Sequence, residues 1–155
     1  MGSAFPFNRK SEKFEDDTWS DIFDPPGVEA LSESAVIFHA GNFYYFGGYD
    51  GRGCYGPKCN GPTYDGRLNT IFRLKSAKWV WSVVGRLNAV RRGNAVILVE
   101  NTFMVIGGVG EKPNEACLLG ENGIFTCEET SSLDTYWYYP VLFLVNDEYE
   151  DCQKT

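Results

Sequence analysis

The sequence predicts an all-β fold, and three observations lead to this prediction. The apolar segments are short and are bounded by turn residues. They are rich in β-branched and aromatic side chains, and Phe, Trp and Tyr make up 15% of the chain. The chain also contains 17 Gly and 7 Pro, which favour turns over helices. Helical periodicity is confined to one short candidate, residues 27–34.

Six segments are the clearest predicted strands, and they carry little internal polarity, as strands buried on both faces do. They are residues 35–39, 43–46, 79–84, 95–99, 103–106 and 141–145. Three short polar stretches each separate an apolar run from an aromatic residue and are predicted turns: 40–42, 100–102 and 146–148. Units of strand, turn and strand therefore recur along the chain.

Charge and size narrow the classes of partner. The chain has 14 Lys and Arg against 21 Asp and Glu, a formal net charge of −7. Phosphate neutralisation needs a clustered excess of Lys and Arg, so we expect no nucleic-acid partner. No apolar run approaches the roughly 20 residues of a transmembrane helix, so we expect no membrane span. The 155 residues, of which 43% are hydrophobic, suffice for one globular core.

The chain aligns with itself when it is shifted by 60 residues. Residues 35–37 then match 95–97, and the strand, turn, strand and Gly-Gly pattern is repeated in the same register. A further shift of 46 residues gives a partial third copy, in which residues 141–145 fall on 95–99 and Tyr149 falls on Phe103.

This pattern resembles the kelch repeat, the four-stranded blade of one β-propeller family. The residues that carry the resemblance are Phe43 to Gly48 and Phe103 to Gly108, where Gly47-Gly48 and Gly107-Gly108 end the second strand of each unit. The family places a Trp in the last strand, a position that Trp79 or Trp81 supplies in the first repeat. The second repeat departs from the pattern, because Phe125 lies near that position, and Arg91 and Arg92 match the family's Arg only loosely.

The resemblance implies antiparallel four-stranded sheets, with a β-sandwich as the alternative. We expect an N-terminal extension at 1–17 and a repeat domain at 18–155, divided into a blade end at 18–31, blades at 32–91 and 92–137, and a partial blade at 138–155. At about 50 residues per repeat the chain holds roughly three blades, whereas propellers need about 4 to 8. The propeller is therefore incomplete, either as a fragment of a larger one or as a homo-oligomer whose copies complete the ring.

A long insertion follows the first Gly-Gly pair and contains Tyr-Asp-Gly-Arg twice, at 49–52 and 64–67. Loops on a rigid scaffold often bind partners, and Tyr and Arg are enriched at interface hot spots. A decorated surface loop without function is the competing interpretation. The candidate binding residues are Tyr49, Asp50, Arg52, Tyr64, Asp65, Arg67, Arg91 and Arg92.

The five cysteines offer two disulfide arrangements. A three-residue loop at 121–123 places Cys117 opposite Cys127, whereas a two-residue loop pairs Cys117 with Glu128. Cys54 and Cys59 form a second candidate pair and leave Cys152 over. This spacing leans slightly toward an oxidising, extracellular compartment, and reduced cysteines in the cytoplasm fit nearly as well.

No catalytic constellation or cofactor motif is recognisable, and we expect no catalytic residues, no cofactor and no metal. The single His, His39, lies in an apolar strand, and no Cys-x-x-Cys pair is present for zinc. The favoured function is a non-enzymatic protein-binding or scaffold module that binds through the loops after Gly-Gly, with a glycan as the other ligand class. The alternatives are a carbohydrate-active enzyme that uses carboxylates such as Asp50 and Asp65, and a self-assembling extracellular component.

Overall fold

Ten β-strands and no helix occur among the residues that the computed structural model describes, which are 11–28, 31–51, 66–109, 113–131 and 138–142. The all-β prediction is therefore confirmed. β1 (Ser11–Glu15) and β2 (Thr18–Ile22) pair with each other alone and form a two-stranded hairpin. β1 lies within residues 1–17, the range that the sequence predicts as an N-terminal extension, and it pairs along its whole length with β2.

The other eight strands form two antiparallel four-stranded sheets, in which each strand pairs with its neighbour in sequence. The first sheet consists of β3 (Ala35–His39), β4 (Asn42–Phe46), β5 (Leu68–Lys75) and β6 (Val80–Arg91). The second sheet consists of β7 (Asn94–Val99), β8 (Thr102–Gly107), β9 (Glu115–Leu119) and β10 (Phe125–Glu129). Neither sheet closes into a barrel.

The repeat seen in the sequence is repeated in strand pairing. Ala35 pairs with Phe46 at the open end of β3 and β4, and Ala95 pairs with Ile106 at the same place in β7 and β8. β3 and β4 are joined by the tight turn 40–41, and β7 and β8 by the turn 100–101. The first two strands of each sheet are therefore equivalent residue by residue at a spacing of 60.

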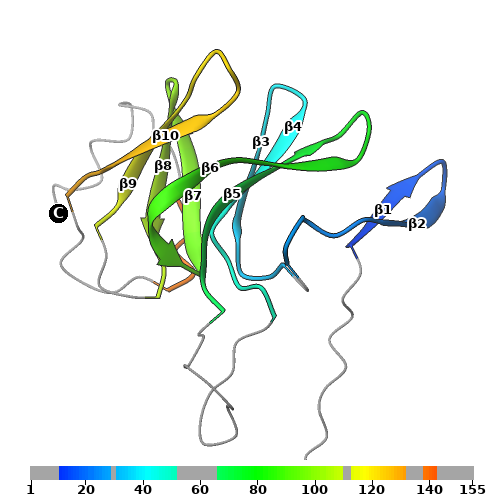
Figure 1. Cartoon of the computed structure of the whole chain (residues 1–155), viewed down its shortest axis with the longest axis horizontal. Coiled ribbons are helices and arrows are strands. Elements are labelled where there is room, and N and C mark those ends of the chain that lie inside the picture. Colours follow the sequence, from blue (N-terminus) through cyan, green and yellow to red (C-terminus); the bar gives the residue numbers. More distant parts are fainter. Residues whose placement is uncertain (1–10, 29–30, 52–65, 110–112, 132–137, 143–155) are drawn as a thin grey trace, which may run out of the picture.

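The two sheets lie face to face (Figure 1), and aromatic side chains pack between them. Phe103 of β8 lies at the centre, with ring centroids 5.9 Å from Phe46 of the first sheet and 5.0 Å from Phe125 of the second. Tyr44 packs edge-on against Phe125 at 5.3 Å. All four side chains are almost fully buried, and aromatic burial of this kind contributes most of the energy of such a core.

The first Gly-Gly pair lies where a side chain would collide with backbone, and Gly108 of the second pair leaves room only for a tight contact. Gly47 and Gly48 have φ of 64° and 110°, and a Cβ at Gly47 would lie 2.6 Å from the Arg91 carbonyl oxygen. A Cβ at Gly108, whose φ is 99°, would lie 3.0 Å from the Arg92 carbonyl oxygen. The glycines let β4 and β8 end directly against the chain that passes from one sheet to the next.

Trp81 and Trp79 have different positions in the first sheet. Trp81 lies in β6 and packs on Tyr45 and Phe72, with ring centroids 4.9 Å and 6.4 Å apart. Trp79 lies in the turn before β6 with a φ of 49°, one residue outside the strand that was predicted to contain it. Trp81 is thus the tryptophan that packs within the sheet.

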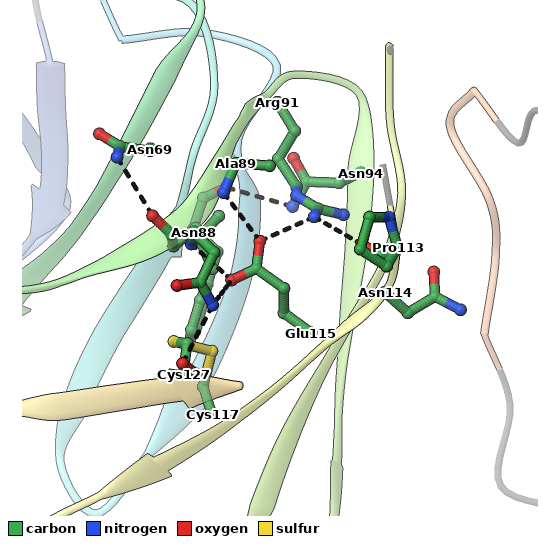
Figure 2. Close-up of polar contacts among 12 residues, drawn as sticks. Asn69, Asn88, Ala89, Arg91, Asn94, Pro113, Asn114, Glu115, Cys117 and Cys127 are labelled. Atoms are coloured by element: carbon green, nitrogen blue, oxygen red, sulfur yellow. Dashed lines mark hydrogen bonds and ion pairs between the residues drawn. A yellow bond between two sulfur atoms is a disulfide. The ribbon is translucent and has the colours of Figure 1, made fainter. Parts of the chain in front are cut away.

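A buried ion pair joins the two sheets. The Arg91 guanidinium at the end of β6 donates to Glu115 Oε1 of β9 at 2.7 Å, and both side chains are at most 1% exposed (Figure 2). Arg91 also donates to the carbonyl oxygens of Gly107 and Pro113, at 3.1 Å and 2.8 Å. Burial lowers the pKa of Arg91, and the Glu115 carboxylate opposes that shift.

The Glu115 carboxylate accepts backbone hydrogen bonds from the first sheet as well. The N–H of Asn88 donates to Oε2 at 2.7 Å, and the N–H of Ala89 donates to Oε1 at 3.2 Å. The Asn88 side chain donates to the same Oε2 and to the carbonyl oxygen of Cys127. One carboxylate of the second sheet therefore fixes the position of β6, as Figure 2 shows.

The structure confirms the disulfide between Cys117 and Cys127. The two residues pair directly across β9 and β10, with Cα atoms 4.0 Å apart. The Gly120 N–H donates to the Ile124 carbonyl oxygen, which leaves the three-residue loop 121–123 and excludes the two-residue alternative. Cys54, Cys59 and Cys152 lie outside the described residues.

Substitution of Arg91 by Met should destabilise the chain by about 3–5 kcal/mol, because the Glu115 carboxylate would stay buried without its cation. Chemical denaturation measures this change. Arg86→Met is the matched control, since Arg86 is an exposed arginine of the same strand and its loss should cost less than about 1 kcal/mol. The double variant Arg91→Met/Glu115→Leu should be more stable than the sum of the two single changes predicts; strict additivity would contradict a coupled pair.

Reduction of the Cys117–Cys127 disulfide should lower the free energy of unfolding by about 2–3 kcal/mol, because the bond closes a loop with a sequence separation of 10. A thermal melt with and without dithiothreitol measures the loss. The Cys117→Ala/Cys127→Ala variant should melt at one temperature under both conditions. A variant that still responds to the reductant would locate the effect in another cysteine.

Candidate functional site

Five side chains gather at the end of the two sheets where β3 begins and β4 and β6 end. They are Glu33, Tyr49, Arg92, Tyr138 and Tyr139, and we call them the end cluster. Residues 138–142 pass beneath the two sheets at the lower end in Figure 1, which brings the two tyrosines to Glu33 from a distant part of the sequence.

Tyr49 is held by backbone pairing on both sides. Its N–H and carbonyl oxygen bond the backbone of Ser32 at 2.7 Å and 3.0 Å, and it forms an isolated bridge with Arg67. Its ring lies directly over Gly66, where a Cβ would approach within 2.3 Å. The Tyr49 ring is therefore fixed in place, and the Arg92 guanidinium lies over it at 5.2 Å in a cation–π contact.

Glu33 connects the arginine to the tyrosines. Its Oε1 lies 3.6 Å from the Arg92 guanidinium, and its Oε2 accepts a hydrogen bond from the Tyr138 hydroxyl at 2.8 Å. The Tyr138 and Tyr139 rings lie 4.1 Å apart, and their hydroxyls are 3.2 Å apart. Hydrogen bonding with Tyr139, followed by that with Glu33, raises the pKa of Tyr138.

The end cluster presents aromatic surface to solvent. Tyr138 is 47% exposed and Tyr139 is 55% exposed, whereas Arg92 is about one quarter exposed. Two exposed tyrosines beside a paired arginine and carboxylate can supply flat apolar contact, hydrogen-bond donors and acceptors in one patch. Such a patch is suited to non-covalent binding.

A ladder of backbone hydrogen bonds supports the cluster. The Gly93 N–H donates to the Glu33 carbonyl oxygen at 2.8 Å, and the Tyr139 N–H donates to the Gly93 carbonyl oxygen at 2.7 Å. All three residues have a left-handed backbone, with φ of 55°, 63° and 54°. Their spacings of 60 and 46 residues are those of the sequence repeat, so they are equivalent positions of three successive repeats.

The structure brings only part of the predicted binding set together. Tyr49 and Arg92 meet in the end cluster, and Arg67 lies next to Tyr49 and donates to the Val109 carbonyl oxygen at 3.2 Å. Asp50 is fully buried and Arg91 is held in the inter-sheet ion pair, so neither presents its side chain to a partner. Three further candidates lie outside the described residues: Arg52, Tyr64 and Asp65.

Sequence reasoning missed Glu33, Tyr138 and Tyr139. The available signal was the repeat itself, because residues 33, 93 and 139 each precede the first residue of an aligned strand by two positions.

A separate group of possible metal ligands consists of Glu115, Cys117 and Cys127, whose ligand atoms lie within 4.8 Å of one another. Its two sulfurs are bonded to each other and its carboxylate accepts bonds from Arg91 and β6, so the group does not fit a metal ion as it stands.

No family model matches the chain, and no curated protein matches it. One solved structure, titled "Structure of YjhT", is similar over 63% of this chain at 21% identity and a TM-score of 0.46. The chain spans 26% of the length of that chain, and a TM-score below 0.5 does not establish a shared fold. Within its described residues, the chain contains no helix that is long and apolar enough to cross a bilayer.

Tyr138→Phe should remove one ionisation from the group of tyrosines that titrate above the ordinary pKa, because hydrogen bonds hold the Tyr138 proton. Alkaline titration followed by ultraviolet absorbance measures this. Tyr45, whose pKa is raised by burial, should remain in the late group of the variant. An unchanged late group in Tyr138→Phe would contradict the hydrogen bonds of the end cluster.

Proposed function

We propose that the chain is a non-enzymatic protein-binding or scaffold module built from kelch-like β-propeller blades, and that it binds its partner through the end cluster. The observation that carries the proposal is the exposed pair Tyr138 and Tyr139, fixed against Glu33 and Arg92 at the end of the sheets where the loop after Gly47-Gly48 begins.

The packing of the two sheets supports the blade interpretation. Each sheet is a meander of four strands, and the first strands β3 and β7 contact each other, as do the last strands β6 and β10. In this arrangement the first strand of one sheet lies beside the first strand of the next, and the last strand beside the last. Successive blades of a propeller are related in the same way. In a two-sheet sandwich the edges would not have to match strand by strand, so this correspondence favours blades.

The chemistry of the end cluster supports binding. Its charged groups are paired with each other, so the tyrosines and the face of the Tyr49–Arg92 stack can contact a partner without a bare charge being buried. Asp50, one of the two carboxylates considered for an enzyme, is fully buried, and Asp65 lies outside the described residues. A rigid patch of Tyr and Arg loses little conformational entropy on binding.

A glycan is the second candidate ligand. The Tyr138 and Tyr139 rings are exposed and lie beside a carboxylate and a guanidinium, which can bond sugar hydroxyls. The same residues could therefore contact a protein or a glycan. Binding assays with proteins and with glycans distinguish these two ligand classes.

Arg92→Ala and Tyr139→Ala should each weaken binding of a protein partner at least about tenfold, as hot-spot residues do. Proteins retained from a cell extract by immobilised wild-type chain are compared with those retained by each variant, and the affinity of any differential protein is then measured by calorimetry. Arg86→Ala is the matched control, since Arg86 is exposed on β6 away from the cluster. Equal affinities for wild type, Arg92→Ala and Tyr139→Ala would refute the site.

A glycan array tests the second candidate. Retention of one sugar class by the wild type and its loss in Tyr139→Ala would identify the partner as a glycan. Absence of signal on the array, together with a protein ligand that depends on Tyr139, would exclude it.

A further inference from the structure

A pocket of about 210 Å³ lies between the hairpin β1–β2 and the first sheet. Of the eight residues that line it, four are aromatic and three are aliphatic. Glu12 of β1 is the only charged residue of the lining. The aromatic residues are Phe43, Tyr45, Trp79 and Trp81, and with Glu12 we call them the aromatic pocket. None of these five residues belongs to the end cluster.

The first sheet supplies one wall of the aromatic pocket. Tyr44 and Phe46 of β4 lie in the core between the two sheets. Side chains alternate along a strand, so Phe43 and Tyr45 lie on the opposite face of the first sheet. The Trp81 ring packs on the Tyr45 ring there, with centroids 4.9 Å apart. The rings of this wall are therefore held by strand pairing and by contact with each other.

Trp79 is held by the turn before β6. Its N–H donates to the carbonyl oxygen of Lys75 at 2.7 Å, and its φ is 49°. Glycine adopts this left-handed backbone at least cost, and a bulky residue rarely does so. Residues held in such a conformation are found most often at binding and catalytic sites. The indole of Trp79 is thus placed in the lining by a turn that does not itself favour a tryptophan.

A cation already lies over this indole. The hairpin lies beside the first sheet (Figure 1), and the Lys13 ammonium is 5.5 Å from the centre of the Trp79 ring, a cation–π contact. Lys13 also donates to Glu15, so its charge is paired within the hairpin. Lys13 is not part of the pocket lining, which leaves room for a second cation beside the ring.

The composition of the lining selects an organic cation. The faces of aromatic rings attract cations, most strongly where water is excluded. Aliphatic walls favour a cation that carries apolar substituents over a bare ammonium, which is strongly hydrated. Glu12 and the net charge of −7 attract positive ligands, whereas the lining holds no cation for an anion. A volume of about 210 Å³ is below the range of about 300–1,000 Å³ for drug-sized ligands, so the occupant is a small group.

We propose that the aromatic pocket binds a trimethylammonium group. The methyl groups contact the rings and the aliphatic walls, and the positive charge is attracted by the ring faces and by Glu12. Free compounds such as choline carry this group, and so do trimethylated lysine side chains of proteins. The site is separate from the end cluster, so the proposal does not depend on the partner that binds there.

Titration of the full chain with choline, followed by the indole N–H signals in nuclear magnetic resonance spectra, tests the proposal. The signals of Trp79 and Trp81 should shift in a saturable way. The signal of Trp19 should stay in place, because this residue is 70% exposed and packs on Phe14 of the hairpin. Sodium chloride at the same ionic strength is the reference. Trp79 and Trp81 signals that respond to choline no more than to sodium chloride would overturn the proposal.

A neutral isostere separates charge recognition from apolar binding. In 3,3-dimethylbutan-1-ol a carbon atom replaces the nitrogen of choline, so the shape is retained and the charge is lost. The isostere should bind at least about tenfold more weakly than choline, because its attraction to the ring faces is lost. Equal affinities would mean that the pocket accepts any apolar group of this size, which contradicts a cation site.

Substitutions locate the site. Trp79→Leu should weaken choline binding about tenfold, and Trp19→Leu, which removes an exposed tryptophan of the hairpin, should leave it unchanged. Glu12→Gln should weaken binding about threefold, as the loss of a partly screened charge does. Asp17→Asn removes the same charge at the hairpin turn, where the φ of 57° is one that Asn tolerates, and is its control.

Circular dichroism confirms that each variant is folded. Glu12 is exposed, so Glu12→Gln keeps the test decisive if Trp79→Leu is unstable. Wild-type affinity in the folded pocket variants would overturn the site.

Peptides distinguish the two sources of the group. A peptide that contains trimethyllysine is compared with choline and with the same peptide carrying unmodified lysine. Binding of the methylated peptide at least about tenfold tighter than choline would identify a protein side chain as the source, and weaker or equal binding would identify a free compound. The unmodified peptide should bind most weakly, because its ammonium stays hydrated. Equal binding of the two peptides would contradict recognition of the methyl groups.

Discussion

The position of the two sheets relative to each other depends on the buried ion pair between Arg91 and Glu115. Two charges are removed from water there, which is unfavourable unless their attraction and further hydrogen bonds compensate for the lost hydration. The carboxylate accepts from the guanidinium and from two backbone N–H groups of β6, and the guanidinium also donates to two carbonyl oxygens. These hydrogen bonds are directional, so they select one position of the two sheets relative to each other. The aromatic core alone would be compatible with several such positions.

The same region explains why the glycine pairs are required. The carbonyl oxygen of Arg91 accepts the N–H of Gly48 at 2.8 Å, and the Arg91 side chain donates to the carbonyl oxygen of Gly107. The chain between the sheets is thereby held by a glycine pair on each side. A Cβ at Gly47 would lie 2.6 Å from the Arg91 carbonyl oxygen, so a side chain there would displace Arg91, the neighbour of Arg92 in the end cluster.

The fold class and the succession of strand, turn and strand at the start of each sheet followed from the sequence, because a strand, a tight turn and Gly-Gly leave few alternatives. The disulfide followed from a loop-length argument, which the Gly120–Ile124 bond decides. The roles of Arg91 and Glu115 did not, because an arginine beside a turn reads as exposed until its partner from β9 is known. Tyr138 lies 105 residues from Glu33, a contact that only the arrangement of the sheets creates.

The disulfide joins two strands of one sheet and crosses neither the inter-sheet core nor the end cluster. Cys117 is fully buried in the core, whereas Cys127 is only partly buried, so an external thiolate meets the bond at the Cys127 sulfur. Attack there expels the Cys117 thiolate into the apolar core, where burial disfavours its negative charge. The packing of β9 against the first sheet therefore slows reduction of the disulfide, and local separation of the two speeds it.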